Sequence, residues 1–114
     1  MGLAESFPIA SERTADYHRL APAGELDIAT VPLLEAAFDE VERGSATKIV
    51  VDLSAITFID STGLQLLLRM NERCDEAQRL EIVASPAVER LLDITGLRDQ
   101  LPLAAASNGS VDTA

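Results

Sequence analysis

The stretch from Lys48 to Gln78 constrains the fold most, because its hydrophobic pattern changes period in the middle. Residues Lys48 to Leu53 form a short run of apolar and β-branched side chains, which is typical of a strand covered on both faces. From Gly63 onward apolar residues recur every three or four positions, which predicts an amphipathic helix. Its predicted buried stripe is Gly63, Leu67, Met70, Cys74 and Ala77. We therefore expect a strand and then a helix, with Ile56 to Ile59 as an apolar plug between them.

Three small polar residues, Asp60, Ser61 and Thr62, stand where this helix is expected to begin. Thr62 followed by Gln65 fits a capping box, in which the N-cap hydroxyl accepts a backbone N–H and the glutamine side chain reaches back. With Thr62 as the cap, the Ser61 hydroxyl is predicted to lie free outside the helix. A phosphate there would lie beside the positive end of the helix dipole. On spacing alone, however, an ordinary loop or capping hydroxyl is the simpler interpretation of Ser61.

The residues before this stretch predict an N-terminal hairpin and a first helix. Phe7 to Arg13 and Tyr17 to Glu25 are interpreted as two strands joined by a polar turn. Each contains a proline, which cannot donate to a sheet, so these strands are expected near an edge or a bulge. Thr30 is the predicted N-cap of the helix and Gly44 its predicted end. Its apolar face is expected to contain Leu33, Leu34, Ala37, Phe38 and Val41.

The residues after the central stretch predict another strand and another helix. Leu80 to Ala84 is interpreted as a strand, and Ser85 begins a helix that Gly96 ends. Leu101 to Ala104 is a possible last edge strand. The residues expected to face inward from the helix are Val88, Leu91, Leu92 and Ile94.

Strands that alternate with helices imply parallel crossovers, so the sequence predicts an α/β fold. In such folds, binding residues gather at the carboxyl ends of the strands. Asp27 and Asp60 both follow predicted strands, and we expect them to lie close together at one edge. Asp27 is either a cap for the first helix or part of a binding surface, and the surface is favoured.

Two motifs in this order resemble the STAS domain of bacterial anti-sigma factor antagonists. They are Gly24-Glu-Leu-Asp27 and, after Asp52-Leu-Ser, the run Phe58-Ile-Asp-Ser-Thr-Gly-Leu64. The similarity extends over residues 7–104 and implies a STAS-type single domain. It implies a mixed sheet of four to five strands, in which an N-terminal hairpin is followed by parallel βα units with helices packed on the sheet. Residues 1–6 would precede this domain, and residues 105–114 are expected to be a disordered or frayed tail.

In that family the first hydroxyl residue after the aspartate is phosphorylated by a serine kinase that is also the anti-sigma factor. Here this residue is Ser61. The resemblance implies that the unmodified protein binds the kinase and frees the sigma factor, that phosphorylation reverses this, and that a phosphatase acts on Ser61. The implied partner-binding residues are Gly24, Glu25, Asp27, Asp60, Thr62, Gly63, Leu64 and Leu68.

Several of these roles have alternatives. Asp60 either caps the helix or orients the Ser61 hydroxyl, and Thr62 is chiefly structural, with secondary phosphorylation left open. Leu64 and Leu68 lie toward the edge of the apolar stripe, so each is either a core residue or a partner contact. The alternative function is a scaffold or accessory subunit of a stress-signalling assembly or of a lipid transporter.

Composition narrows the possible partners. The formal net charge of −10 and the pI near 4.3 argue against nucleic acid and anionic membranes and favour a protein with a basic face. The single cysteine, Cys74, fits a reducing cytoplasm, and no signal segment or membrane span is evident. No cofactor, metal or catalytic role is expected, because the sequence lacks a Gly-x-Ser-x-Gly elbow, a Walker loop and clustered metal ligands.

Overall fold

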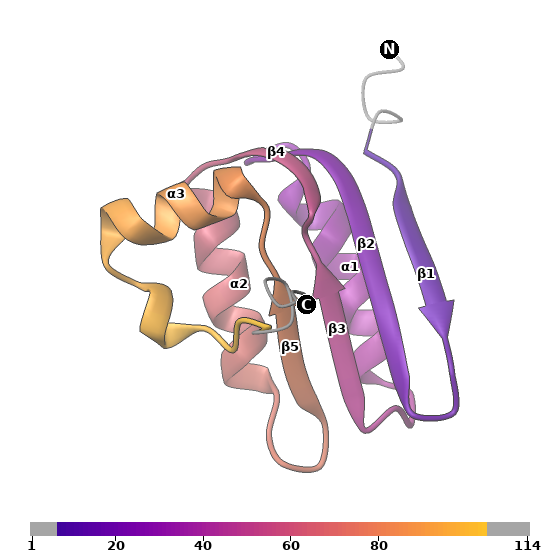
Figure 1. Ribbon diagram of the computed structural model, residues 1–114. Helices are drawn as coiled ribbons and strands as arrows, with labels where there is room; N and C mark the ends of the chain where they lie inside the picture. The colour runs from indigo at the N-terminus through magenta and orange to yellow at the C-terminus, as the bar shows by residue number, and fades with distance from the viewer. Residues whose placement is uncertain (1–6, 105–114) are drawn as a thin grey trace, which may run out of the picture.

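The sheet is organised around its longest strand, β2 (Tyr17–Leu26), which has neighbours on both sides. The computed structural model describes residues 7–104, so the expected N-terminal segment and C-terminal tail lie outside the described residues. In chain order the other elements are β1 (Ile9–Arg13), α1 (Val31–Glu42), β3 (Lys48–Asp52), β4 (Ala55–Ile59), α2 (Ser61–Arg73), β5 (Arg79–Val83), α3 (Pro86–Thr95) and a 3₁₀ turn at Arg98–Gln100 (Figure 1).

The sheet is mixed, as the sequence predicted. β1 pairs antiparallel with β2, and β3, β4 and β5 are all parallel to it. β3 pairs with the first half of β2 and β4 with the second half, and β5 lies on the other side of β3. A turn at Leu53 separates β3 from β4, where the Ile56 N–H donates to the Leu53 carbonyl at 2.9 Å. β4 therefore runs in the same direction as β3 but pairs with β2 and not with β5.

Two predictions about strands were wrong. Residues Ile56 to Ile59 are not a plug but belong to β4, where Ile56 and Ile59 are buried and Thr57 and Phe58 are exposed. A bulge in β4 explains this pattern. Gly24 pairs with Ile56 and Glu25 with Phe58, so Thr57 is an extra residue that interrupts the alternation of inward and outward side chains. The expected edge strand at 101–104 is only a single bridge, between Leu103 and Ile82.

α1 and α2 lie on one face of the sheet, and α3 lies beside β4 (Figure 1). The core is aliphatic apart from Phe7 and Phe38, with Leu34, Leu67 and Met70 fully buried. Four details of the predicted core were wrong: Leu33 is 39% exposed, Ile94 is 73% exposed, Ala77 lies beyond the end of α2, and the buried Leu66 was not expected. Most of these sit near helix ends, where a periodic pattern extends past the actual helix.

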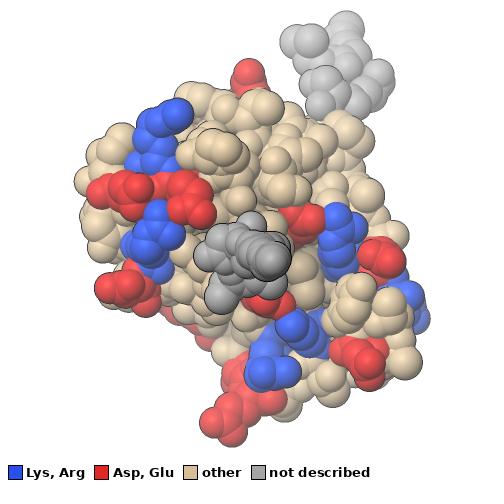
Figure 2. Space-filling view, viewed as in Figure 1, with Lys and Arg blue, Asp and Glu red and all other residues tan. Residues whose placement is uncertain are grey.

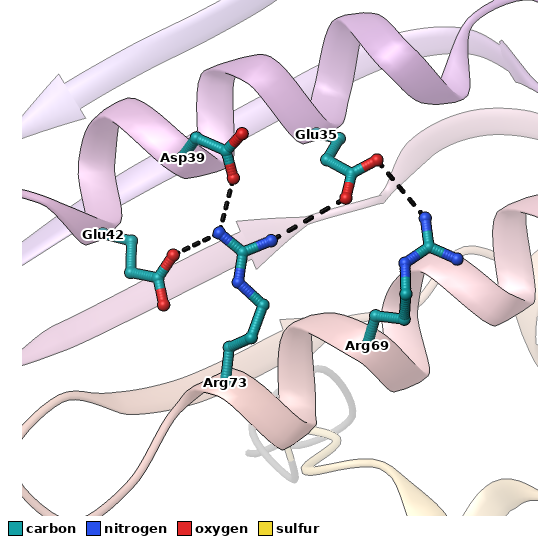
Figure 3. A network of polar contacts seen from close by, with 5 residues as sticks. All are labelled: Glu35, Asp39, Glu42, Arg69 and Arg73. Carbon is teal, nitrogen blue, oxygen red and sulfur yellow. Dashed lines mark hydrogen bonds and ion pairs between the residues drawn. The ribbon is translucent and has the colours of Figure 1, made fainter.

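Ion pairs join the outer surfaces of α1 and α2 (Figure 3). The Arg73 guanidinium contacts Glu35, Asp39 and Glu42 and lies 5.1 Å from the centre of the Phe38 ring. In the described part of the chain, Arg69 pairs with one carboxylate, that of Glu35, at 3.3 Å. Hydrogen bonds to Glu42 and Asp39 raise the pKa of Arg73 far above its ordinary value. Arg73 therefore stays charged and ties the two helices together.

The opposite face of the sheet carries a second ionic cluster. Asp52 is nearly buried, and burial by itself would raise its pKa. Hydrogen bonds from Ser54, whose N–H lies 3.0 Å from Oδ1, and from Arg19, 2.5 Å from Oδ2, outweigh this effect and hold the pKa of Asp52 below its ordinary value. Asp52 is therefore an anion in the folded protein at neutral pH. Acidic and basic side chains lie next to one another over much of this face (Figure 2).

Candidate partner-binding site

The candidate site lies where β2 and β4 end side by side. Leu26 and Ile59 are the last paired residues, and the Asp60 N–H donates to the Leu26 carbonyl at 3.3 Å. Asp27 and Asp60 each follow this pair directly. The structure therefore brings the two motifs together at one edge, as the rule for parallel strands predicts.

Asp60, not Thr62, is the N-cap of α2. Its Oδ1 accepts the Gly63 N–H at 3.1 Å, and its backbone is extended, as an N-cap requires. The Thr62 hydroxyl has no hydrogen-bond partner among residues 7–104. The predicted capping box is wrong, because α2 begins at Ser61 and Thr62 is already inside its first turn.

Ser61 is the first residue of α2 and is exposed. It does not lie outside the helix as expected, but its hydroxyl has no partner within the described residues. The N–H groups of Ser61 and Thr62 likewise have no acceptor in this part of the chain, as is usual for the first turn of a helix. The site thus presents one accessible hydroxyl and two unused backbone donors.

Gly63 and Leu64 are packed into the core instead of lying on the surface. A Cβ on Gly63 would lie 2.9 Å from Ile59 Cγ1 and 2.9 Å from the Leu26 carbonyl oxygen, so only glycine fits there. Leu64 is 4% exposed. Leu68 is half-buried and packs against the core. The expectation that Gly63 and Leu64 contact a partner is therefore corrected, because their side of the helix faces β2 and β4.

The upstream motif also divides into structural and exposed residues. Gly24 has a φ of 113°, which favours glycine, and its carbonyl accepts the hydroxyl of Thr57, the bulge residue of β4, at 3.3 Å. Glu25 is exposed. Asp27 is half-buried, and its Oδ1 accepts the N–H groups of Ala29 and Thr30 at 3.0 and 3.2 Å. Asp27 therefore shapes the turn before α1 and still presents part of its carboxylate to solvent.

Thr30 occupies the N-cap position of α1, as predicted, but its side chain does not cap the helix. Its hydroxyl instead lies 2.7 Å from the Glu25 carbonyl and accepts the Asp27 N–H at 2.9 Å. These contacts hold the end of β2 in place beside the start of α2.

Sequence reasoning missed two apolar side chains at this edge, Ile28 and Phe58, which are 75% and 47% exposed. Phe58 was assigned to the plug, and its exposure depends on the bulge at Thr57 of β4. The glycine at position 24, inside a predicted strand, is the signal that could have pointed to a bulge in this strand pair, although a glycine in a strand by itself indicates a bulge only weakly.

Other features of the described residues lie away from this edge. A hollow of about 470 Å³ between the β1–β2 hairpin and the end of α1 contains none of the predicted site residues. Residues 7–104 contain no group of three or more side chains that could hold a metal ion. No helix in the same range is long and apolar enough to cross a bilayer.

Fold and site together define a small mixed α/β domain whose distinctive group is an exposed serine at the start of a helix, beside the ends of two parallel strands. The family profile described as "Mlab, STAS domain" matches residues 9–104. The chain therefore belongs to the STAS domain family.

Its relatives include regulators of sigma factors. The anti-sigma-B factor antagonist of Staphylococcus epidermidis is 34% identical over 86 residues, which cover 74% of this chain and 80% of that protein. The anti-sigma-F factor antagonist RsfB of Mycobacterium tuberculosis is 37% identical over 71 residues, which cover 62% of this chain and 58% of RsfB. A crystal structure of an anti-sigma factor antagonist from Mycobacterium paratuberculosis is 32% identical, with a TM-score of 0.79, covering 89% of this chain and 87% of that one. These names describe regulatory proteins, not enzymes.

Proposed function

We propose that this chain is an anti-sigma factor antagonist that binds an anti-sigma serine kinase and is released when Ser61 is phosphorylated. The relatives named above support the first part of this proposal. The observation that carries the second part is the exposed Ser61 hydroxyl, which has no partner among residues 7–104 and directly follows the cap of α2. Exchange of partners with a sigma factor would place the protein in the cytoplasm.

The geometry supports a role for Asp60 in phosphoryl transfer beside its role as the cap. Its Oδ1 accepts the Gly63 N–H, and its Oδ2 has no hydrogen-bond partner among residues 7–104, so Oδ2 is available to accept the Ser61 hydroxyl proton when the kinase docks. The cap fixes the start of the helix and therefore the position of Ser61. Asp60 would then hold the serine in place and orient its hydroxyl.

Phosphorylation should disturb binding more than folding. A phosphate adds roughly 1.5 to 2 negative charges at neutral pH. The free N–H groups of Ser61 and Thr62 and the helix dipole are suited to it, so the folded state tolerates the added charge. A partner packed over Ser61 would instead have to accommodate the bulk of the phosphate and remove its water. A phosphatase acting on Ser61 would restore binding.

The test is incubation with each anti-sigma serine kinase encoded in the genome that carries this chain, with Mg-ATP, followed by intact mass measurement and site mapping. We expect one phosphate, on Ser61. Ser61→Ala should bind the kinase and stay bound when ATP is added, whereas Ser61→Asp should bind weakly. Both variants should melt close to the wild type. Thr62→Ala is the matched control and should still be phosphorylated on Ser61. A phosphate on another residue, or equal affinity of the folded Ser61 variants, would contradict the switch.

A scaffold or accessory subunit, in a stress-signalling assembly or beside a lipid transporter, is the second candidate. The description of the matching family profile favours it, because that description names Mlab and not an anti-sigma factor antagonist. In this case Ser61 would remain unmodified by every kinase tested, and Ser61→Asp would leave the partner complex intact.

A further inference from the structure

Four large apolar side chains are strongly exposed among residues 7–104: Ile28, Leu33, Phe58 and Ile94. Single exposed apolar residues are common and need no explanation. Ile28, Leu33 and Phe58, however, belong to two segments, residues 20–42 and 53–68, whose strands end side by side next to Ser61. Only Ile94, on the last turn of α3, lies elsewhere.

Ile28 and Phe58 flank Ser61 along the chain and across the strand pair. Phe58 pairs with Glu25, and both are exposed on the outer side of the ladder, whereas the next pair, Leu26 and Ile59, is buried. Ile28 and Ser61 each lie two residues beyond that buried pair. One apolar side chain therefore lies on β4, the strand that leads into α2, and the other follows the neighbouring strand β2.

A β-bulge in the backbone directs the Phe58 side chain toward solvent. Thr57 is the extra residue of the bulge in β4. It lies opposite the step from Gly24 to Glu25 in β2, and its hydroxyl donates to the Gly24 carbonyl at 3.3 Å. Without the extra residue, a strand alternates strictly, and Phe58 and Thr57 would face opposite ways. The fold thus leaves an aromatic side chain exposed to solvent beside the candidate phosphorylation site.

The charged residues of the two segments that carry these side chains have one sign. Residues 20–42 and 53–68 contain no lysine or arginine, and they place Glu25, Asp27 and Asp60 at the converging ends. In Figure 2 the surface near β4 is mostly uncharged, with one acidic group at its top. A partner that fits this edge has an apolar pocket bordered by basic side chains.

We propose that Ile28 and Phe58 are the apolar anchors through which the unphosphorylated protein docks on the anti-sigma kinase, with the three carboxylates facing basic residues of the kinase. This inference rests on the proposed function. Aromatic residues are enriched in interface cores, and a few buried anchors carry most of the binding energy. A phosphate between the anchors would keep both from packing against the kinase.

The test uses the purified kinase that phosphorylates wild-type Ser61. We expect Ile28→Ser and Phe58→Ser each to weaken kinase binding about 10-fold or more in calorimetric titration. Both should raise the KM for Ser61 phosphorylation and leave kcat unchanged, because the serine itself is untouched. Ile94→Ser is the matched control, since Ile94 is as exposed as Ile28, at 73% against 75%, and it should bind like the wild type.

A variant that adds a positive charge tests whether basic residues border the pocket. Ile28→Lys should bind more weakly than Ile28→Ser if basic residues border the pocket, whereas Ile94→Lys should have no effect. If Ile28→Ser and Phe58→Ser are both folded by thermal melting and bind the kinase with wild-type affinity, the two residues are not docking anchors. That result would leave the proposed Ser61 switch unaffected. Failure of every kinase to bind or phosphorylate the wild type would overturn the proposed function, and the anchors with it.

Discussion

Replacing Gly63 with alanine measures how closely α2 packs against the strands beneath the candidate site. The added Cβ would lie 2.9 Å from Ile59 Cγ1, 2.9 Å from the Leu26 carbonyl oxygen and 3.0 Å from Leu26 Cγ. Optimal carbon contacts are about 3.5–4.0 Å, so something must move. Leu26 is fully buried and its carbonyl accepts the Asp60 N–H, so neither its side chain nor its backbone can retreat easily.

The expected magnitude follows from two opposing effects. Overpacking costs about 1–3 kcal/mol, and we take the upper end because one of the close atoms belongs to the backbone. Alanine in a helix gains at most about 1 kcal/mol over glycine. The free energy of unfolding of Gly63→Ala should therefore fall by about 2 kcal/mol.

Urea denaturation followed by circular dichroism measures this loss, and a thermal melt should show a fall of roughly 8 °C, at about 4 °C per kcal/mol for a domain of this size. Gly96 provides the control, because it has a φ of +72° and nothing within 4 Å of its Cβ position. Gly96→Ala should lose about 1 kcal/mol through backbone strain alone, and Gly96→Asn should recover most of it. A Gly63→Ala protein as stable as the wild type would refute the close packing described here.

Three further changes test other contacts of the fold. Asp60→Ala should lower stability by about 1 kcal/mol in thermal melts because the helix loses its cap, and Thr62→Ala should stay within about 0.5 kcal/mol of the wild type; a larger loss for Thr62→Ala would reverse the cap assignment. Because the pKa of Asp52 is held below its unfolded value, its contribution is complete above about pH 4 and is lost as the pH falls through the folded-state pKa. The stability difference between the wild type and Asp52→Asn should therefore shrink below about pH 4 in acid titrations, and a constant difference would contradict this. Arg73→Ala should cost about 1 kcal/mol and Arg69→Ala close to nothing in urea denaturation at low salt, since Arg73 contacts three carboxylates and Arg69 one; equal losses would mean that the network adds nothing.

The sequence predicted the parts of the fold that depend on periodicity. The change of period after Lys48 located β3 and α2, and the alternation of elements predicted a mixed sheet with parallel crossovers. β4 was missed because Thr57, the extra residue of its bulge, breaks the alternation that identifies a strand, and the position of this bulge depends on the pairing with β2. A local pattern carries no information about the register of its neighbour, so Phe58 could not be assigned to the surface from its own segment.

The site was predictable in location but not in detail. The rule that parallel strands end at one edge brought Asp27 and Asp60 together correctly. The start of α2 was not predictable, because Asp60 and Thr62 are both good N-cap residues. Tertiary contacts decide between them: the Leu26 carbonyl accepts the Asp60 N–H, and Gly63 must lie against Leu26. The same contacts make Gly63 and Leu64 core residues, although their motif resembles a binding loop.

The pairing of β2 with β4 has a consequence for how any enzyme would recognise Ser61. It joins segments 33 residues apart in the chain, and the carbonyl that orders the start of α2 comes from the distant one. A peptide containing residues 55–73 alone would lack that carbonyl, the bulge and the turn at Asp27. Such distant pairings form only as the whole chain folds. Only the folded protein thus presents Ser61 in this arrangement. A kinase that recognises the arrangement would distinguish folded molecules from nascent or unfolded ones.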